Sequence, residues 1–164
     1  SAIVFMDGIV GLSGGVFTAI FAGYAGVAYA QSQFDLAALC VTLAGATLAF
    51  LWFNIPPARF WMTETGTMAL TLALAVIVFM TDSLGDGHGI SLFFVIGLPL
   101  VVTVASNIIQ VLSKRFRGGK KVFRIAPLHH HFEAIGWPSY KVTMRYWVIS
   151  IACALLGLAI APIL

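Results

Sequence analysis

The chain has 164 residues, of which 60% are hydrophobic and only 9% are charged, whereas roughly 25% of residues are charged in a typical soluble domain. Because a globule of this length cannot bury so much apolar surface, the composition excludes a soluble domain and indicates an integral membrane protein. The formal net charge of +3 is interpreted as a topology signal and an attraction to anionic headgroups or phosphates, and no nucleic-acid partner is expected.

Five apolar stretches are long enough to span a membrane, since a spanning helix needs about 20 mostly apolar residues. They cover approximately residues 9–30, 35–53, 66–82, 89–112 and 142–163. Turn and breaker residues separate them, and the longest connection is the loop 113–141. Pro99 falls inside the fourth stretch and is expected to kink it. The predicted fold is all-α, a polytopic membrane helix bundle with about five transmembrane helices.

The start of the chain and its cysteines carry little signal. No initiator methionine and no charged segment precede the first apolar stretch, so the start does not resemble a signal peptide, and we expect a piece of a longer protein. Cys40 and Cys153 lie in separate apolar stretches and form neither a CxxC motif nor a zinc spacing. They are interpreted as apolar packing residues.

Charge predicts the orientation of the bundle. With five helices, all basic residues fall on one side: Arg59, Lys114, Arg115, Arg117, Lys120, Lys121, Arg124, Lys141 and Arg145. The opposite loops contain only acids: Asp35, Asp82 and Asp86. The positive-inside rule therefore places the basic side in the cytoplasm and the C-terminus outside. The segments around Asp7, Glu64 and 129–133 all fall on this cytoplasmic side.

The most concentrated polar feature is a run of three histidines, His129, His130 and His131, beside Glu133. Histidine titrates near neutral pH, so such a cluster suits proton transfer or phosphate contact. Consecutive side chains point apart, so the three imidazoles are not expected to bind one ion together, and zinc sites require a closed, spaced set of ligands. The alternative is an interfacial polar loop without chemistry.

Asp7, followed by Gly8 and Gly11, stands at the start of the first predicted helix. An acid beside glycines at a helix start allows close approach to a phosphate or a metal. It is equally suited to cap the helix, and taken alone the residue favours the cap.

The connection after the second helix holds two further candidates. Glu64 could ligate a hard cation such as Mg²⁺, which prefers carboxylate oxygens and retains several waters. Trp61 could stack on a nucleobase. The alternatives are that Glu64 complements the helix dipole with Thr63 as the cap, and that Trp61 belongs to an interfacial aromatic belt.

Taken together and in this order, these segments resemble the polyprenyl-phosphate N-acetylhexosamine-1-phosphate transferases. The most specific match runs from Phe123 to Glu133, with Gly136-Trp137-Pro138 and Arg145-Tyr146-Trp147. The histidine motif favours the phospho-N-acetylmuramoyl-pentapeptide branch of this superfamily. The resemblance extends essentially from end to end and implies that residues 1–164 are the C-terminal half of a ten-helix membrane domain.

The resemblance implies a reaction and its partners. In this branch, phospho-MurNAc-pentapeptide moves from UDP-MurNAc-pentapeptide to undecaprenyl phosphate with Mg²⁺, forming lipid I for peptidoglycan synthesis. The expected location is the bacterial inner membrane, with membrane lipid around the helices, the active-site loops in the cytoplasm and a possible homodimer. Phosphoryl transfer chiefly needs positioning and charge neutralisation, much of which a bridging metal supplies.

The resemblance also implies roles for residues in the first half of the chain. Asp7 and Gly8 would border the uridine and diphosphate site, Asp7 as a catalytic residue. Glu64 stands where the family has a Mg²⁺-binding aspartate. Trp61 stands where an aromatic residue packs on uracil, and Asn54 is expected to bind substrate.

In the second half, the resemblance points to the histidine run. His129, His130 and His131 are expected to contact the nucleotide sugar and its phosphates as catalytic residues, His129 foremost. Glu133 is expected to bind substrate beside them. All four residues match the family motif as it stands.

Three positions depart from the family pattern. Val10 replaces the second acid of Asp-Gly-x-Asp-Gly, Val4 replaces an asparagine, and Glu64 replaces an aspartate. Glutamate keeps the charge but is one methylene longer, and a displacement of about 1 Å can lower a rate about a hundredfold. Because the paired aspartates of the N-terminal half are also absent, this fragment alone is expected to be inactive.

The departures leave a second function class open, a catalytically degenerate relative that binds the lipid carrier or a membrane partner without turnover. The histidine run favours the enzyme, whereas Val4, Val10 and Glu64 favour the degenerate relative. An ion transporter would need ionisable groups at mid-membrane depth, and the sequence places its candidates at helix ends.

Overall fold

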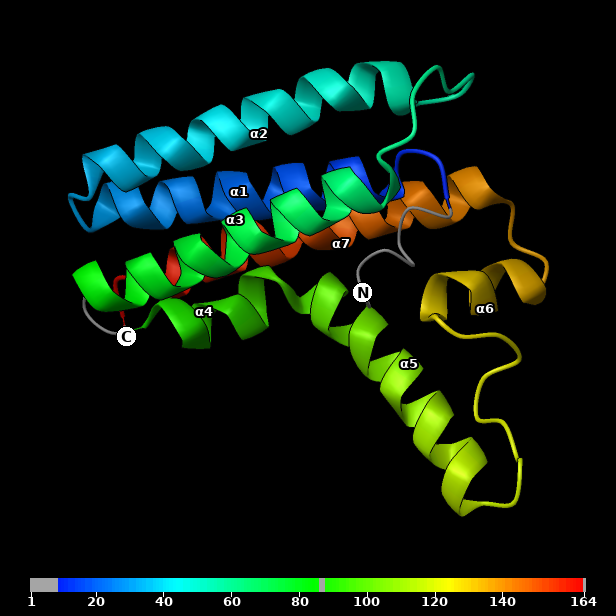
Figure 1. The fold of residues 1–164 in the computed structure, drawn as a ribbon. Coiled ribbons are helices and arrows are strands. Elements are labelled where there is room, and N and C mark those ends of the chain that lie inside the picture. The colour runs from blue at the N-terminus through cyan, green and yellow to red at the C-terminus, as the bar shows by residue number, and fades with distance from the viewer. Residues whose placement is uncertain (1–8, 86–87, 164) are drawn as a thin grey trace.

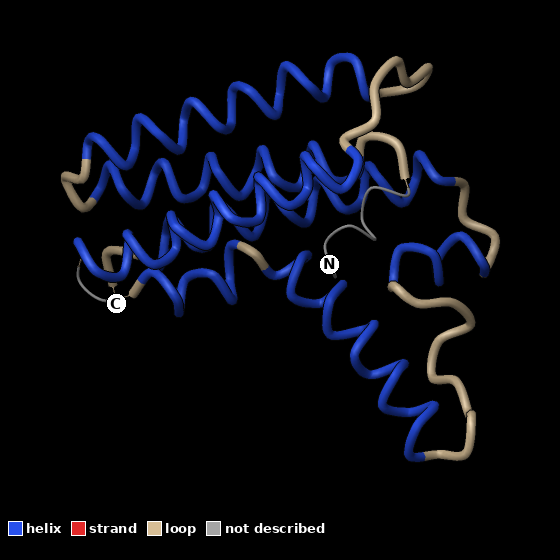
Figure 2. The backbone as a smooth tube through the Cα atoms, in the orientation of Figure 1, coloured by secondary structure: helices blue, strands red, loops and turns tan. Residues whose placement is uncertain are grey.

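The computed structural model describes residues 9–85 and 88–163. These residues form helices only, which confirms the all-α prediction for the described part of the chain (Figures 1 and 2). The helices are α1 (Leu12–Ala30), α2 (Phe34–Asn54), α3 (Thr63–Leu84), α4 (Gly89–Ile96), α5 (Leu98–Phe116), α6 (Leu128–Ala134) and α7 (Ser139–Ile160).

Four helices, α1, α2, α3 and α7, are each long and apolar enough to cross a membrane, and α4 with α5 makes a fifth span if the bent pair is counted as one. The predicted multi-pass bundle of about five spans is therefore confirmed. Boundaries moved by three residues: α1 begins at Leu12, α3 at Thr63 and α7 at Ser139. Met62, not Thr63, occupies the cap position of α3, so the alternative in which Thr63 caps this helix is wrong.

The fourth predicted helix, 89–112, is broken rather than continuous. α4 and α5 meet at an angle of 78°, and Gly97 lies between them. Pro99 stands in the first turn of α5, where a proline is tolerated because its missing N–H has no intrahelical partner to lose. The predicted disturbance at Pro99 is confirmed, but it separates two helices instead of kinking one.

The expected loop 113–141 contains a helix that the sequence did not predict. α6 is only seven residues long, and its first turn forms because the Pro127 carbonyl accepts from the backbone N–H groups of His130 and His131 at 3.1 and 3.3 Å. Gly136 follows with a φ of +101°, a conformation that glycine adopts at helix C-termini without steric cost. The histidines are therefore presented on one short helix.

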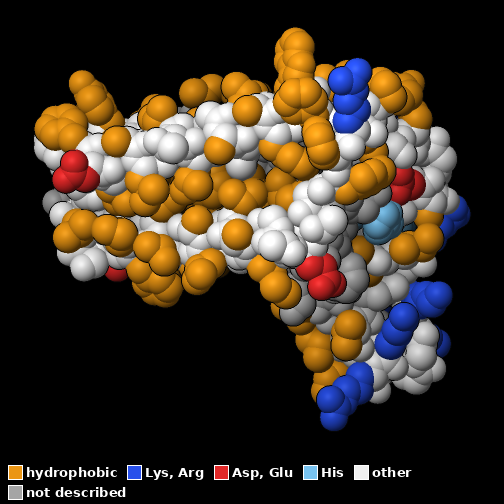
Figure 3. Space-filling view, turned by 45° about the horizontal axis from the view of Figure 1, so that its top comes forward, with side chains coloured by type: hydrophobic (Ala, Val, Ile, Leu, Met, Phe, Trp, Pro, Cys, Tyr) orange, Lys and Arg blue, Asp and Glu red, His pale blue; other side chains and the backbone are white. Residues whose placement is uncertain are grey.

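The centre of the bundle is α1. In its most apolar 18-residue stretch 78% of the residues are buried, against 28–33% in the corresponding stretches of α2, α3 and α7. Close packing of α1 on α7 requires Gly15, because a Cβ there would lie 2.1 Å from Nε1 of Trp147. The outer helices turn apolar side chains outward (Figure 3), as expected for helices whose neighbours are lipid.

One end of the bundle gathers the candidate residues, and we call it the site end. It comprises the start of α1, the loop 55–62, the starts of α3 and α7, and α6 (Figure 1). A second region, the arm, consists of α5 and residues 117–127, and it projects sideways from the bundle. In Figure 3 the Lys and Arg side chains lie toward the site end and along the arm. Asp35 and Asp82 belong to the opposite end, at the start of α2 and the end of α3.

Candidate functional site

The three consecutive histidines of α6 occupy different environments. His129 is fully buried, whereas His130 and His131 are partly exposed. The His129 ring lies 4.4 Å from the His130 ring and 6.4 Å from the Tyr146 ring of α7, measured between centroids. His129 therefore packs into the junction of α6 and α7, and its two neighbours remain accessible to a ligand.

His130 is oriented by a carboxylate. Its Nδ1 lies 2.8 Å from Oε2 of Glu133, and the Ser139 hydroxyl donates to Oε1 of the same carboxylate at 2.5 Å. Partial burial acts to raise the pKa of Glu133, but the hydrogen bonds from Ser139 and His130 outweigh it and the pKa is lowered. An ionised Glu133 only accepts, so Nδ1 of His130 carries the proton and Nε2 is left to face a ligand.

His131 has the opposite hydrogen-bonding role at Nδ1. The backbone N–H of Arg124 donates to its Nδ1 at 3.2 Å, so this nitrogen is an acceptor and the proton of the neutral ring sits on Nε2. The Arg124 guanidinium also donates to the carbonyl of Ala134 at the end of α6. His130 can thus offer a lone pair where His131 offers a donor, a combination suited to recognising a partly protonated phosphate.

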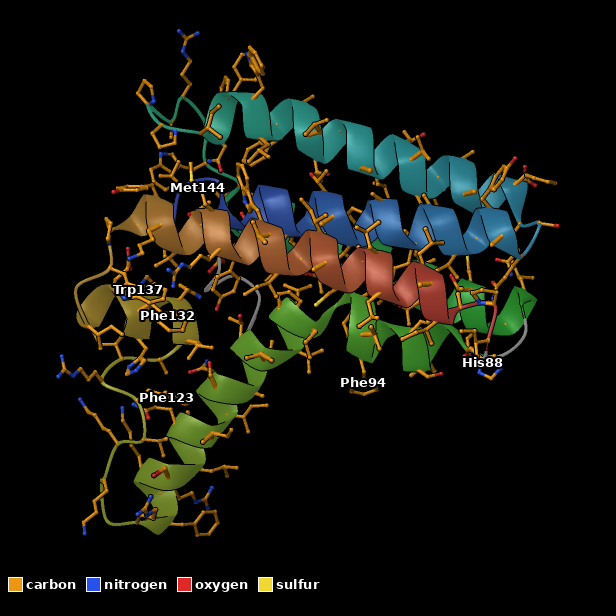
Figure 4. The ribbon with its side chains drawn as sticks, turned by 180° about the vertical axis from the view of Figure 1, so that it is seen from behind. His88, Phe94, Phe123, Phe132, Trp137 and Met144 are labelled. Atoms are coloured by element: carbon orange, nitrogen blue, oxygen red, sulfur yellow. The ribbon has the colours of Figure 1, made fainter. Side chains whose placement is uncertain are left out.

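An aromatic stack fixes α6 against α7. Trp137 stacks on Phe132 with ring centroids 4.8 Å apart, and Figure 4 shows the two labelled rings side by side. From α7, the Arg145 guanidinium lies 4.1 Å from the Trp137 ring and the Lys141 ammonium 4.9 Å from it. Through Trp137 and Phe132, these cation–π contacts hold α6 in a defined position against α7.

A polar stripe on α7 links the histidine helix to the start of α1. Its members, Ser139, Thr143 and Trp147, are spaced four residues apart and so share one helix face. Ser139 binds Glu133 of α6, the Thr143 hydroxyl donates to the Val10 carbonyl at 3.3 Å, and Trp147 Nε1 donates to the Gly11 carbonyl at 2.9 Å. Sequence reasoning did not single out Ser139 or Thr143, although the four-residue spacing of polar side chains on an apolar helix was a usable signal.

Asn54 links the start of α1 to the loop 55–62. Its Oδ1 accepts from the Gly11 N–H at 2.8 Å, and its Nδ2 donates to the Phe60 carbonyl at 2.7 Å. The residue is 1% exposed, so its amide is committed to these two backbone partners. In this structure Asn54 connects the start of α1 to the loop 55–62, and its contact with substrate stays a prediction.

Trp61 and Glu64 are both exposed at the site end. Trp61 borders an apolar cavity of about 450 Å³ between α2 and α3, with Phe50 and Gly66 among its lining residues. Glu64 stands in the first turn of α3. Its carboxylate is free to reach a ligand at that helix end.

The residues present fit a Mg²⁺ ion held jointly with a substrate. Among the described residues, no three His, Cys, Asp or Glu side chains converge as ligands. Mg²⁺ in phosphoryl-transfer sites, however, is usually bound by only one or two protein carboxylates together with substrate phosphates and water. Glu64 would be the carboxylate available for such an ion, whereas Glu133 is occupied by His130 and Ser139.

The remaining candidates lie at the N-terminus. Asp7 and Gly8, together with Val4, fall outside the described residues. Val10 is described and lines a cavity of about 470 Å³ at the site end, with Ile55, Tyr140 and Met144 among the other lining residues. The position where the family pattern has its second acid therefore faces an apolar space bounded by α7.

Comparison with known proteins identifies the family. The model of glycosyl transferase family 4 matches residues 1–82, half of the chain. The chain belongs to glycosyl transferase family 4. This confirms the resemblance drawn from the motifs, and it places α1, α2 and most of α3 inside the matched region.

Proteins named phospho-N-acetylmuramoyl-pentapeptide-transferase are similar to this family 4 chain over most of its length. The one from Geobacillus sp. (strain WCH70) is 39% identical over 160 residues, covering 98% of the chain and 47% of that protein. The one from Francisella tularensis subsp. novicida (strain U112) is 43% identical over 125 residues, covering 76% of the chain and 33% of that protein. The chain thus spans about half of the length of the Geobacillus protein and about a third of the Francisella protein.

Proposed function

We propose that the protein containing this chain transfers phospho-MurNAc-pentapeptide from its UDP carrier to undecaprenyl phosphate, forming lipid I. The observation that carries the proposal is the hydrogen-bonded framework at the site end. Through Ser139, Thr143, Trp147 and Asn54 it joins the histidine helix, the start of α1 and the loop before α3. The names of the relatives supply the substrate class.

Each segment of the framework has a task in this proposal. Trp61 packs on the uracil ring, and Glu64 with the diphosphate holds Mg²⁺. When bound, the metal neutralises the charge that develops on the transferring phosphate. His131 donates to a phosphate oxygen through Nε2, and the lone pair at Nε2 of His130 accepts a proton from the acceptor phosphate. Asp7 and Gly8 border the diphosphate.

An apolar cavity supports a polyprenyl acceptor. It has a volume of about 230 Å³ and lies where α5, α6 and α7 meet, with Val102, Leu128, Phe132 and Ile149 among its lining residues. Leu128 directly precedes His129, so an isoprenoid chain in this cavity would bring its phosphate to the histidine helix. An apolar cavity directly beside a polar helix suits a lipid that has an apolar chain and a phosphate head.

The proposal is tested by lipid I synthesis with the full-length protein in detergent, from UDP-MurNAc-pentapeptide and undecaprenyl phosphate. We expect Mg²⁺-dependent product that His130→Ala and Glu64→Ala each reduce at least about a hundredfold, since each removes an interaction with charge in the transition state. Tyr29→Ala, an exposed residue at the opposite end, is the matched control. Product formed equally by all variants, or without Mg²⁺, would contradict the proposal.

A second function, a degenerate relative that binds the lipid carrier without turnover, is favoured by two observations. Val10 presents no carboxylate to its cavity, and Glu64 replaces the shorter acid. The double variant Val10→Asp, Glu64→Asp distinguishes the two functions. A large gain in turnover identifies a weakened enzyme, whereas carrier binding with no turnover in either form identifies the degenerate relative.

We further propose that the site end faces the cytoplasm at the bacterial inner membrane, with the C-terminus outside, and that two copies associate as a homodimer. The basic residues of the site end and arm support the orientation. Because this chain covers about half of the length of the Geobacillus relative, we expect it to be inactive when expressed alone.

A further inference from the structure

The arm carries a dense cluster of cations. Six basic residues fall between residues 114 and 124: Lys114, Arg115, Arg117, Lys120, Lys121 and Arg124. All six side chains are exposed, and no acidic residue occurs from Leu98 to Phe132. Within the described residues, the contact of His130 with Glu133 is the one between a basic side chain and a carboxylate, so these six cations have no carboxylate partner there.

Hydrogen bonds from α5 fix the backbone of the segment that carries the cluster. The segment after α5 folds back along that helix and is held by three buried side chains spaced along one face, Ser106, Gln110 and Ser113. Gln110 binds three backbone groups of Val122 and Phe123 at 2.8–3.0 Å. Ser113 donates to the Lys120 carbonyl at 2.9 Å, and Ser106 accepts from the Leu128 N–H at 3.0 Å.

Exposed apolar side chains accompany the cations. Phe116 is 78% exposed, and Val122 and Ile125 are 48% and 50% exposed. The exposed face of α5 is apolar as well, with Ile108, Val111 and Leu112 turned outward. A surface with apolar anchors directly beside unpaired cations matches the boundary between acyl chains and headgroups.

The position of the arm fits the same boundary. α5 leaves the bundle at 78° to α4, and its basic tip lies toward the site end (Figures 1 and 3). Arg59 in the loop 55–62 and Lys141 and Arg145 at the start of α7 belong to the same end. A membrane that surrounds the bundle would therefore meet the tip at its surface, where juxtamembrane cations attract anionic lipids.

We propose that the tip of the arm, residues 114–124, is a binding surface for the headgroups of anionic phospholipids. The cations neutralise the lipid phosphates while Phe116 and Val122 insert beside the acyl chains. The occupant is bulk anionic lipid of the leaflet that faces the site end, and of the six cations Arg124 is the one that is bonded to the histidine helix. Lipid binding at this surface requires no transferase activity.

The test uses the full-length protein in detergent, titrated with phosphatidylglycerol or phosphatidylcholine and followed by native mass spectrometry. Five cations are replaced together in Lys114→Gln/Arg115→Gln/Arg117→Gln/Lys120→Gln/Lys121→Gln, and Arg124 is kept because it binds Ala134. We expect wild type to retain phosphatidylglycerol selectively. Affinity should fall about fivefold per charge removed and at least about a hundredfold in the quintuple variant.

Single variants keep the test decisive if the quintuple variant is unstable. Arg117→Gln should weaken phosphatidylglycerol binding about fivefold, whereas Arg59→Gln, an exposed arginine at the same end but outside the arm, should leave it unchanged. Equal affinities for both lipids, equal losses in both single variants, or displacement of phosphatidylglycerol by equimolar undecaprenyl phosphate would each overturn the proposal.

Discussion

At the scale of single residues, the three histidines differ in what they can do. His129 is buried against Tyr146, His130 is oriented by an ionised glutamate, and His131 accepts a backbone hydrogen bond. The expectation that placed His129 foremost rested on the motif alone. The geometry shifts the emphasis to His130 and His131, because a ring with an accessible nitrogen is required to touch a phosphate.

The role of Glu133 can be measured without turnover. In Glu133→Gln the neutral amide no longer requires a proton on Nδ1 of His130, so the ring should lose its tautomer preference. Imidazole ¹⁵N shifts should then change for His130 and remain unchanged for His131. Unaltered shifts at His130 would show that Glu133 does not orient it.

The lowered pKa of Glu133 sets a pH dependence. Because the folded-state pKa lies below the ordinary value of 4.5, the stabilisation by this carboxylate is fully present above pH 4.5 and is lost as the pH falls through the lowered pKa. The stability difference between wild type and Glu133→Gln should therefore persist at pH 5–7 and shrink below pH 4.5. Thermal unfolding in detergent across this range measures it, and a difference that grows on acidification would contradict the sign.

Asn54 is expected to act as a clamp. Asn54→Ala leaves the Gly11 N–H and the Phe60 carbonyl without this partner, which should cost about 1–3 kcal/mol of stability for buried groups. Asn54→Asp keeps the acceptor for Gly11, but when ionised it turns a carboxylate oxygen toward the Phe60 carbonyl in a buried site, so it should be at least as destabilised as Asn54→Ala. Thermal unfolding ranks the three proteins, and an alanine variant as stable as wild type would exclude the clamp.

At the scale of elements, the packing of α1 on α7 supports the site framework. Gly15 lets the Trp147 indole approach α1 and bind the Gly11 carbonyl. Gly15→Ala should displace the indole and destabilise the protein by about 1–3 kcal/mol, as overpacking does. Gly45→Ala on α2 is the control, because its added Cβ would meet no atom within 4 Å; equal effects of the two changes would refute this packing role.

The elements also show where sequence reasoning succeeds. Long apolar stretches predicted α1, α2, α3 and α7 within a few residues, because a spanning helix has a strong length and hydropathy signal. α6 escaped prediction because it is short and polar, and its first turn depends on the Pro127 carbonyl. Likewise, hydropathy runs through Gly97 without interruption, so the pattern alone could not reveal that α4 and α5 separate there.

The placement of the candidate residues was more predictable than their contacts. The histidine motif, Trp61 and Glu64 were proposed from residue type and resemblance, and they lie at one end of the bundle, as the segment order predicted. The connections through Ser139 and Thr143 were not found, since they join positions far apart in sequence, such as Thr143 and Val10. Such contacts depend on helix rotation, which apolar composition leaves undetermined.

At the scale of the whole molecule, charge separates the two ends. A topology test follows from Lys120 on the arm and Asp35 at the start of α2. Single cysteines at these exposed positions, introduced beside the buried Cys40 and Cys153, should react differently with an impermeant maleimide. We expect Lys120→Cys to label only after the inner membrane is opened and Asp35→Cys to label in spheroplasts; the reverse pattern would invert the proposed orientation.

The central claim is that the segments at the site end form one site for a uridine-nucleotide sugar. It is tested most directly by calorimetric binding of UDP-MurNAc-pentapeptide to the full-length protein, with and without Mg²⁺. We expect Trp61→Ala to weaken binding about tenfold through lost stacking, and Glu64→Ala to weaken it only when Mg²⁺ is present. Trp52→Ala, which removes an exposed tryptophan of α2, should have no effect. Binding that is unchanged by Trp61→Ala and Glu64→Ala, or absent in wild type, would contradict the account.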